Sequence, residues 1–252
     1  MTEPTVNIAS ESRPAPGIPF FTQVLVELRK SINTHVAKAV LGSFLGLGLL
    51  VNLFVLLNTP EPTLSSAGLV AAVAALGLPI VSALVMTSEW SQRTAMTTFW
   101  LEPKRHRVLL AKVVSALVLG VGLISALLTI MFIVIAVLLL ARGMPVTTDG
   151  LGDLLLSVYV GGVFGVLFGV AWGAALMSTP LTLLWVLVVS LVIDLVLPFV
   201  AGDLAQWFST STASNWIIDR TAPGLPVLSS FLIWYVVPLA VGFFLQGRRE
   251  VR

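Results

Sequence analysis

The sequence predicts an all-α polytopic membrane protein with six transmembrane helices. Hydrophobic residues make up 57% of the chain and charged residues only 10%, whereas a soluble domain carries about a quarter charged residues. The mean hydropathy of +1.01 agrees with this bias. Lipid must therefore cover much of the surface. The absence of cysteine excludes disulfides, thiolate metal sites and a cysteine nucleophile.

Residues 1–19 are polar and rich in proline, and they lack the basic start and short apolar core of a signal peptide. We expect a disordered cytoplasmic tail there. Residues 20–38 have a different character, because at 100° per residue their apolar and polar side chains separate into two arcs. The apolar arc holds Phe20, Phe21, Val24, Leu25, Leu28, Ile32 and Val36.

The opposite arc of residues 20–38 is polar and includes Arg29 and Lys30. A helix of this kind lies in the membrane interface, with its apolar side toward lipid and its basic residues near anionic headgroups. The alternative is a helix packed against the cytoplasmic ends of the protein's own spans. Both interpretations place this amphipathic helix at the cytoplasmic face.

A membrane helix needs about 20 mostly apolar residues to cross the hydrocarbon core. Residues 39–245 contain six such stretches and form the predicted transmembrane domain. The third stretch is longer than a bilayer requires, so it must tilt or project into water. The predicted spans are Ala39–Leu57, Gly68–Met86, Val113–Leu140, Leu154–Met177, Leu181–Val200 and Val227–Leu245.

The distribution of Lys and Arg predicts the orientation. With the N-terminus inside, 12 of the 14 Lys and Arg residues lie on the inner side, and only Arg142 and Arg220 lie outside. The reverse topology inverts this ratio. We therefore expect a multi-pass protein of the cell (plasma or inner) membrane with both termini in the cytoplasm, including a short tail at residues 246–252.

The predicted outer segment, residues 201–226, mixes Trp207 and Trp216 with charged and hydroxyl side chains. Aromatic residues among polar ones are typical of the headgroup zone. A pair of short helices dipping into the outer leaflet and an ordinary loop are both compatible with this composition.

The cytoplasmic loop between the second and third spans, residues 87–112, contains many of the inner charges together with Trp90, Phe99 and Trp100. Basic residues here satisfy the positive-inside rule by themselves. Apolar side chains interleaved with them indicate a surface that docks onto another protein.

The loop carries a pattern of acidic, aromatic, basic and proline residues: Glu89, Trp90, Arg93, Thr94, Pro103, Arg107 and Lys112. In this pattern it resembles the cytoplasmic loop of ABC-2 type transporter permeases. In that family an acidic-aromatic start, a Gly-Thr pair and a Pro-basic cluster precede a Lys that opens the third span. Arg93 stands where the family usually has Gly. The six-span layout and the amphipathic helix extend the resemblance to an ABC-2 (type V exporter-like) architecture.

The resemblance implies that the loop forms a coupling helix that fits a groove on a separate ABC ATP-binding subunit. It makes Glu89, Arg93 and Thr94 candidate contacts to that subunit, with Arg107 and Lys112 anchoring the loop at the membrane. It also implies a second permease, in a homodimer or heterodimer. The chain has no Gly-Lys-Ser/Thr phosphate loop. We therefore expect ATP to be bound by the partner and not directly by this chain.

Asp194 is the only ionisable residue deep within a predicted span. A charge at the bilayer centre costs about 2.5–3.5 kcal/mol on insertion scales. Pro198, four residues later, deprives the Asp194 carbonyl of its helical partner. One interpretation puts Asp194 on the substrate path or at an outer gate. The other makes it a protonated or internally paired residue at a structural hinge.

The fourth span carries glycines at steps of four: Gly161, Gly165, Gly169 and Gly173. These align on one face and allow another helix to approach closely. Packing within the chain and a dimer interface are both compatible with this stripe.

No set of residues indicates catalysis or a metal site. We therefore expect a non-enzymatic permease subunit of an ATP-driven exporter for an amphipathic or hydrophobic substrate such as a drug, peptide or lipid, with lipid contacts and no nucleic-acid partner. The alternatives are an ion-coupled secondary transporter and a non-transporting membrane scaffold subunit.

Overall fold

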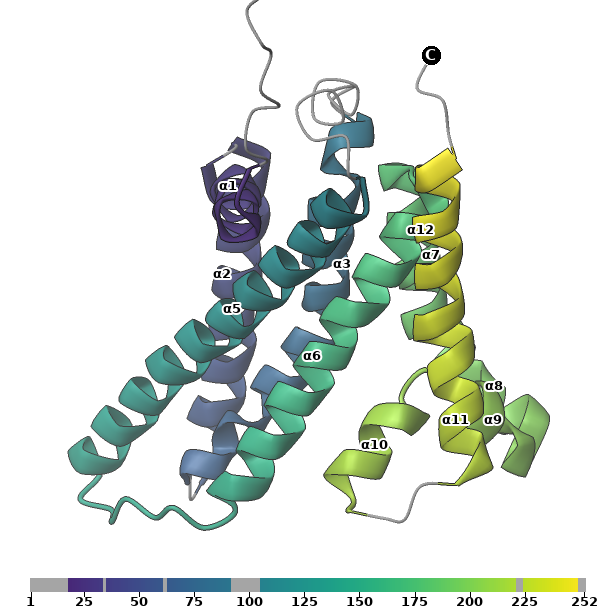
Figure 1. The fold of residues 1–252 in the computed structure, drawn as a ribbon. Helices are drawn as coiled ribbons and strands as arrows, with labels where there is room; N and C mark the ends of the chain where they lie inside the picture. The colour runs from purple at the N-terminus through teal and green to yellow at the C-terminus, as the bar shows by residue number, and fades with distance from the viewer. Residues whose placement is uncertain (1–17, 34, 61–62, 92–104, 221–223, 249–252) are drawn as a thin grey trace, which may run out of the picture.

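The computed structural model describes residues 18–33, 35–60, 63–91, 105–220 and 224–248. Within these residues every regular element is a helix, and the long helices form one bundle (Figure 1). Five helices are long and apolar enough to cross a membrane, and a sixth apolar helical stretch, Leu76–Trp90, is shorter. This is the architecture of a multi-pass helical membrane protein.

The described residues of the first half of the chain include the helices α1 (Phe20–Asn33), α2 (His35–Asn58), α3 (Leu69–Ser91) and α5 (Arg105–Ala141). A 3₁₀ turn, η1 (Leu64–Gly68), precedes α3. Helix α5 has 37 residues, which corresponds to about 55 Å at 1.5 Å per residue. It runs obliquely across the bundle (Figure 1), as expected for a span longer than the hydrocarbon core is thick.

The second half begins with α6 (Leu151–Leu176). The predicted fifth span comprises α7 (Thr179–Val188), a π-helical turn η2 (Val189–Ile193) and α8 (Asp194–Ala201). The predicted sixth span comprises α11 (Leu225–Phe231), a second π-helical turn η4 (Leu232–Val236) and α12 (Val237–Arg248). Each of the last two spans therefore contains one π-helical turn.

Between these spans lie a 3₁₀ turn, η3 (Gly202–Leu204), and two short helices, α9 (Ala205–Phe208) and α10 (Thr212–Ile218). The described part of the predicted outer segment is thus mostly helical. We call this the α9–α10 end of the bundle. The other end carries the finish of α3, the start of α5, helix α1 and the finish of α12 (Figure 1), and we call it the loop end.

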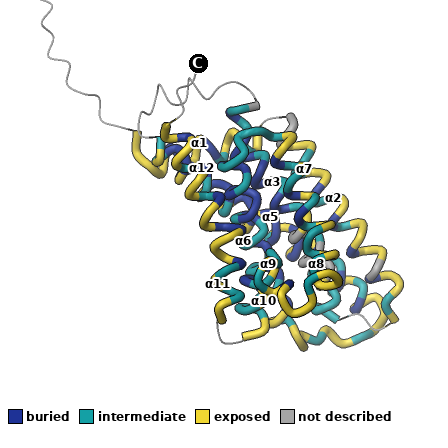
Figure 2. Tube along the Cα trace, turned by 90° about the vertical axis from the view of Figure 1, so that its right-hand side faces the viewer, coloured by how far each residue is buried: buried dark blue, intermediate teal, exposed yellow. Residues whose placement is uncertain are grey.

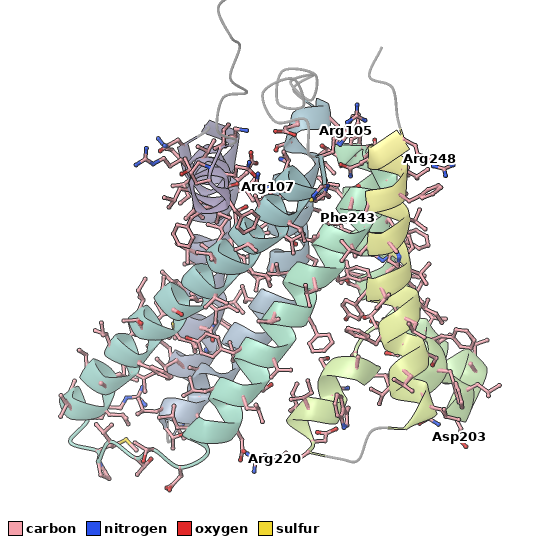
Figure 3. All side chains as sticks on the ribbon, in the orientation of Figure 1. Arg105, Arg107, Asp203, Arg220, Phe243 and Arg248 are labelled. Atoms are coloured by element: carbon pink, nitrogen blue, oxygen red, sulfur yellow. The ribbon has the colours of Figure 1, made fainter. Side chains whose placement is uncertain are left out.

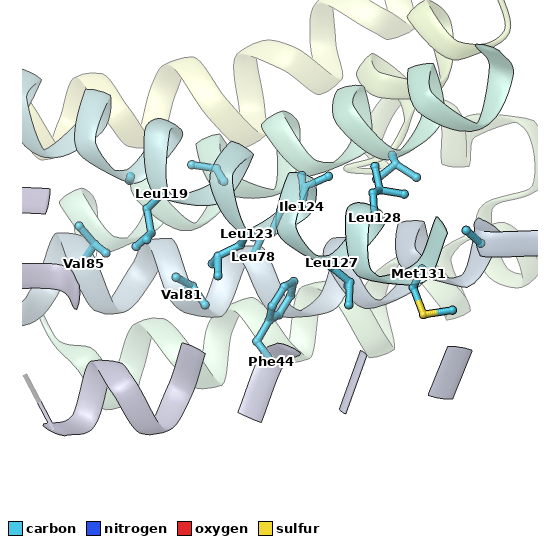
Figure 4. Close-up of a cluster of buried hydrophobic side chains, with 14 of the residues drawn as sticks. Phe44, Leu78, Val81, Val85, Leu119, Leu123, Ile124, Leu127, Leu128 and Met131 are labelled. Carbon is cyan, nitrogen blue, oxygen red and sulfur yellow. The ribbon is translucent and has the colours of Figure 1, made fainter. Parts of the chain in front are cut away.

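The main hydrophobic core lies between α2, α3, α5 and α6 (Figure 4). Its side chains include Phe44, Leu78, Ile124, Leu127 and Val166. A second core joins α6 to α7, α10 and η4. Burial is concentrated along the centre of the bundle, and the periphery is exposed and apolar (Figure 2). Of the apolar window in α6, 44% is buried, against 11% for Thr179–Phe208, so α6 is central and the α7–α8 span is peripheral.

Candidate functional site

Four charged side chains meet at the loop end and form a network that we call the charge cluster: Glu27, Lys30, Glu89 and Lys112. Helix α1 supplies Glu27 and Lys30, the last turn of α3 supplies Glu89, and the first part of α5 supplies Lys112. The Lys112 Nζ atom lies 3.0 Å from Glu27 Oε2 and 3.6 Å from Glu89 Oε2. The cluster thus connects α1 to both helices that flank the 92–104 segment.

Lys30 closes the network from the side of α1. Its Nζ atom lies 2.7 Å from Glu27 Oε1 and 3.3 Å from Glu89 Oε1. Each carboxylate therefore faces two ammonium groups, and each ammonium group faces two carboxylates. The formal charges of the cluster sum to zero.

Three members of the charge cluster are buried: Glu27 and Glu89 are 5% exposed and Lys112 is 2% exposed. The side chain of Lys30 is 46% exposed. Removing a charge from water costs several kcal/mol per ion unless partners compensate it. Because the carboxylates have two cationic partners each, the cluster is compensated only when its members are present together.

The pKa of Glu27 reflects this balance. Burial by itself raises the pKa of the Glu27 carboxyl, but Lys112 and Lys30 together outweigh burial and hold the pKa below its ordinary value. For Lys30, burial lowers the pKa of the ammonium group, while Glu27 and Glu89 more than offset it and raise the pKa. Both groups are therefore held in their charged forms.

Helix α1 leaves most of its apolar residues exposed. Phe21 is 73% exposed and Leu25 is 47% exposed, whereas Gln23, Val24 and Glu27 are buried. The face that contacts the protein therefore lies at the boundary between the predicted apolar and polar arcs. Helix α1 therefore packs on the bundle through one face while most of its apolar arc stays exposed, and its position in the membrane interface stays a prediction.

The predicted coupling loop is described only at its flanks. Arg93, Thr94 and Pro103 lie outside the described residues. Glu89, predicted as a contact to an ATPase, is directed inward to the charge cluster, and Trp90 beside it is half-buried. Lys112, predicted to anchor the loop at the membrane surface, is also buried in the cluster.

Two arginines at the start of α5 connect it to other parts of the loop end (Figure 3). Arg107 donates to the carbonyl oxygen of Ile18 at 3.1 Å, and Arg105 donates to that of Gln246 at 3.0 Å. The Gln246 side chain in turn donates to the carbonyl oxygen of Ala174 in α6. The start of α5 is therefore hydrogen-bonded to the segment before α1 and to the end of α12.

The glycine stripe of α6 faces α3. A Cβ atom at Gly169 would overlap the carbonyl oxygen of Pro79 and the hydroxyl of Ser82, and one at Gly173 would lie 2.9 Å from the Cβ atom of Met86. A Cβ atom at Gly165 would lie 3.3 Å from the Pro79 ring. A Cβ atom at Gly161 meets nothing within 4 Å. Three of the four glycines thus allow the close α3–α6 contact.

Asp194 lies near the α9–α10 end, directly after the π-helical turn η2. Its carboxylate accepts hydrogen bonds from the hydroxyl of Ser209 at 3.1 Å, from the backbone N–H of Thr210 at 3.0 Å and from the hydroxyl of Thr210. We call this group the Asp194 clamp. It ties α8 to the turn between α9 and α10, and a place for Asp194 on a substrate path stays a prediction.

The same turn is held from the other side by α11 and η4. Trp234 Nε1 donates to the carbonyl oxygen of Phe208 at 2.7 Å, and the Tyr235 hydroxyl donates to that of Thr210 at 3.0 Å. Ser230 donates to the carbonyl oxygen of Ser209 at 2.7 Å. The turn after α9 is therefore fixed between two spans that each contain a π-helical turn, a feature often found at functional sites.

Sequence analysis did not identify Glu27 and Lys30 as partners of the loop flanks. Both residues belong to the predicted polar arc, and nothing in their spacing indicates which distant residues they meet. The available signal was that Glu27 is the one acidic residue of the amphipathic segment 20–38, where the other charged residues are basic. Among the described residues no group of His, Asp and Glu side chains is arranged to hold a metal ion.

In comparisons with family models, curated proteins and solved structures, nothing matches this chain.

Proposed function

We propose that the chain is the transmembrane subunit of an ATP-driven ABC exporter and works with a separate ATP-binding subunit. The observation that carries this proposal is the charge cluster. It joins Glu89 and Lys112, at the two flanks of the predicted coupling loop, to the amphipathic helix α1. A push on residues 92–104 would therefore move α1, α3 and α5 together.

The remainder of the bundle supports transmission of such a movement. The glycine-mediated contact couples α3 to α6, and Gly242 brings α12 against α6, since a Cβ atom at Gly242 would lie 2.5 Å from the Cβ atom of Ala174. Closely packed helices shift as units because packed interiors are not continuously deformable. A change in the tilt of α3 and α5 would thus be transmitted through these contacts to α6 and α12.

In this proposal both chain termini face the cytoplasm, and the cargo is an amphipathic or hydrophobic molecule that leaves the cell through a cavity shared with a second permease. The ion-coupled alternative would need an intramembrane ion site. The Asp194 carboxylate instead accepts its hydrogen bonds from Ser209 and Thr210. The exporter proposal therefore accounts for more of the polar residues of the structure.

Purification of the full chain from its native membrane in mild detergent, followed by mass spectrometry of the copurifying proteins, tests this function. We expect a P-loop ATPase in about equal amount. Arg93→Glu should reduce its recovery, because Arg93 lies in the predicted docking segment. Arg142→Glu makes the same charge change beyond the far end of α5 and should leave recovery unchanged. Recovery of the chain with no nucleotide-binding partner would contradict the proposal.

A further inference from the structure

The second hydrophobic core contains an unusual concentration of aromatic side chains, which we call the aromatic cluster. Helices α6 and α7 contribute four of them, and α11 and η4 contribute three. Neighbouring ring centroids are 5.0–6.4 Å apart. The members are Phe164, Phe168, Trp172, Trp185, Phe231, Trp234 and Tyr235.

The polar atoms of the aromatic cluster divide into two groups. Trp234 and Tyr235 donate to backbone carbonyl oxygens of the turn after α9, as described above. The Nε1 atoms of Trp172 and Trp185 are also buried, but they have no hydrogen-bond partner in the described part of the chain. A buried tryptophan N–H usually finds an acceptor, and leaving a buried donor unsatisfied costs about 1–3 kcal/mol.

The two unsatisfied donors belong to one structural unit. The rings of Trp172 and Trp185 contact each other with centroids 5.0 Å apart at an interplanar angle of 49°. They come from different helices, α6 and α7. Both side chains are half-buried, although their N–H atoms are covered. The indole pair is therefore partly exposed, and it carries two buried donors that have no acceptor in the described part of the chain.

We propose that the Trp172–Trp185 pair is a binding site for an uncharged aromatic molecule that carries a carbonyl oxygen. The aromatic rings would contact the flat body of the ligand, and one or both indole N–H groups would donate to its carbonyl oxygen. No member of the aromatic cluster is charged, so a neutral ligand is favoured. Because the N–H groups are buried, the atoms that cover them must move to admit the ligand.

If this ligand is the exported cargo, the site specifies the substrate class, and that statement rests on the proposed function. Binding itself does not require the ATP-binding subunit. The test therefore uses the full chain alone in lipid nanodiscs. Its outcome is independent of the copurification experiment, so either proposal can fail while the other stands.

The probes are 9-fluorenone and fluorene, which share a ring skeleton and differ in the carbonyl group. Equilibrium dialysis against nanodiscs with and without protein measures the preference for the ketone. We expect the wild-type chain to bind fluorenone about tenfold more tightly than fluorene after correction for lipid partition, since 1.4 kcal/mol corresponds to a factor of ten and a hydrogen bond contributes about 0.5–1.5 kcal/mol.

Phenylalanine substitutions remove the N–H group and keep an aromatic ring. The double variant Trp172→Phe, Trp185→Phe should lose the ketone preference and still bind both probes. Trp234→Phe is the matched control, because its N–H group is already bonded to Phe208 within the protein; it should keep the preference. An unchanged preference in the double variant would overturn the proposal.

The infrared carbonyl stretch of fluorenone provides a second readout on the wild-type chain and needs no variant to fold. Donation from an indole N–H shifts this band to lower frequency than in protein-free nanodiscs. We expect a shifted band that saturates with ligand. A band identical to that in protein-free nanodiscs would also overturn the proposal and would leave water as the occupant of the two donors.

Discussion

The two ends of the bundle handle buried polar groups in different ways. At the loop end, the charge cluster compensates charge with charge, across α1, α3 and α5. At the α9–α10 end, the Asp194 clamp surrounds one carboxylate with hydroxyl and backbone donors from a single turn. Figure 3 shows further charged side chains at each end, with Arg105, Arg107 and Arg248 at the first and Asp203 and Arg220 at the second.

The two arrangements differ in how many helices are affected when one polar group is lost. Loss of Lys112 from α5, for example, leaves the buried carboxylates of Glu27 on α1 and Glu89 on α3 without their buried cationic partner. Loss of the Asp194 charge leaves neutral donors that can still pair with an oxygen at the same position. The charge cluster therefore makes three helices depend on one another, whereas the Asp194 clamp fixes the local path of the chain.

Lys112→Met should have the largest effect on the folded state. Methionine retains much of the side-chain length, but it removes the buried ammonium group that lies 3.0 Å from Glu27 and 3.6 Å from Glu89, and both carboxylates stay in the interior. Breaking a buried ion pair by removing one partner costs about 3–5 kcal/mol. We expect a loss of this size in the free energy of unfolding, measured by denaturation of the full chain in lipid nanodiscs.

Lys30→Met is the matched control for the charge cluster. The Lys30 side chain is 46% exposed, and exposed ion pairs contribute about 0–1 kcal/mol. Its loss should therefore be clearly smaller than that of Lys112→Met. Equal losses for the two variants would show that burial of Lys112 does not decide the stability of the cluster.

Gly169→Ala disturbs the α3–α6 contact that lies between the two ends. The added Cβ atom would overlap the backbone carbonyl of Pro79, so α6 and α3 must separate. Overpacking of this kind costs about 1–3 kcal/mol. Gly161→Ala is the control on the same helix, because open space surrounds that position. In nanodiscs the unfolding midpoint of Gly169→Ala should therefore be lower than that of Gly161→Ala. Equal midpoints would contradict the close α3–α6 contact.

Asp194→Asn should lower the free energy of unfolding by less than Lys112→Met or Gly169→Ala. The asparagine side-chain oxygen can still accept from the Thr210 N–H and the Ser209 hydroxyl, and only the Thr210 hydroxyl, which donates to the second oxygen, loses its acceptor. Hydrogen bonds to charged groups contribute about 1.5–3 kcal/mol and neutral ones about 0.5–1.5, so a loss of about 1 kcal/mol is expected. Asp203→Asn, at an exposed position near the same end, should change the free energy of unfolding less.

A transport assay separates the two interpretations of Asp194. A hinge residue predicts that Asp194→Asn alters stability but leaves substrate export intact. A residue on the substrate path predicts a loss of export with only this modest loss of stability.

The sequence predicts the long apolar helices of the bundle well because hydrophobicity is a local property of the chain. The predicted Leu154–Met177 differs from α6 by one to three residues at its ends. Helix α5 begins eight residues before the predicted Val113, because Arg105–Lys112 is too polar to be counted within a span, although it continues the helix beyond the apolar region. The π-helical turns depend on tertiary packing and have no comparable signal.

The polar contacts were less accessible to sequence reasoning. Lys112 and Glu27 are 85 residues apart, and only the packing of α1 across α5 brings them together. Asp194 stands out in the sequence because a carboxylate within an apolar span is rare. Its donors Ser209 and Thr210 do not stand out, because hydroxyl residues are common in a segment expected to lie near headgroups.

The pH dependence of stability gives the finest comparison. Glu27 has a pKa below its ordinary value of 4.5 in the folded state, so its contribution is complete above the unfolded pKa and is lost as pH falls through the folded pKa. Lys30 has a raised pKa, so its contribution is complete below its ordinary value of 10.5 and is lost as pH rises through the folded pKa. The charge cluster should therefore stabilise the chain across the range between them.

The measurement is the unfolding midpoint of the full chain in nanodiscs of uncharged lipid, followed from about pH 7 to about pH 3, where carboxylates with depressed pKa values take up protons. Glu27→Gln should start from a lower midpoint at neutral pH and then fall less steeply than the wild type on acidification, because glutamine does not titrate. If acid acts mainly through the charge cluster, the unfolding midpoint of Asp194→Asn should fall with pH about as steeply as that of the wild type. Parallel curves for the wild type and Glu27→Gln would show that acid destabilises the chain elsewhere, and the loop end would then lose its role as the acid-sensitive part of the bundle.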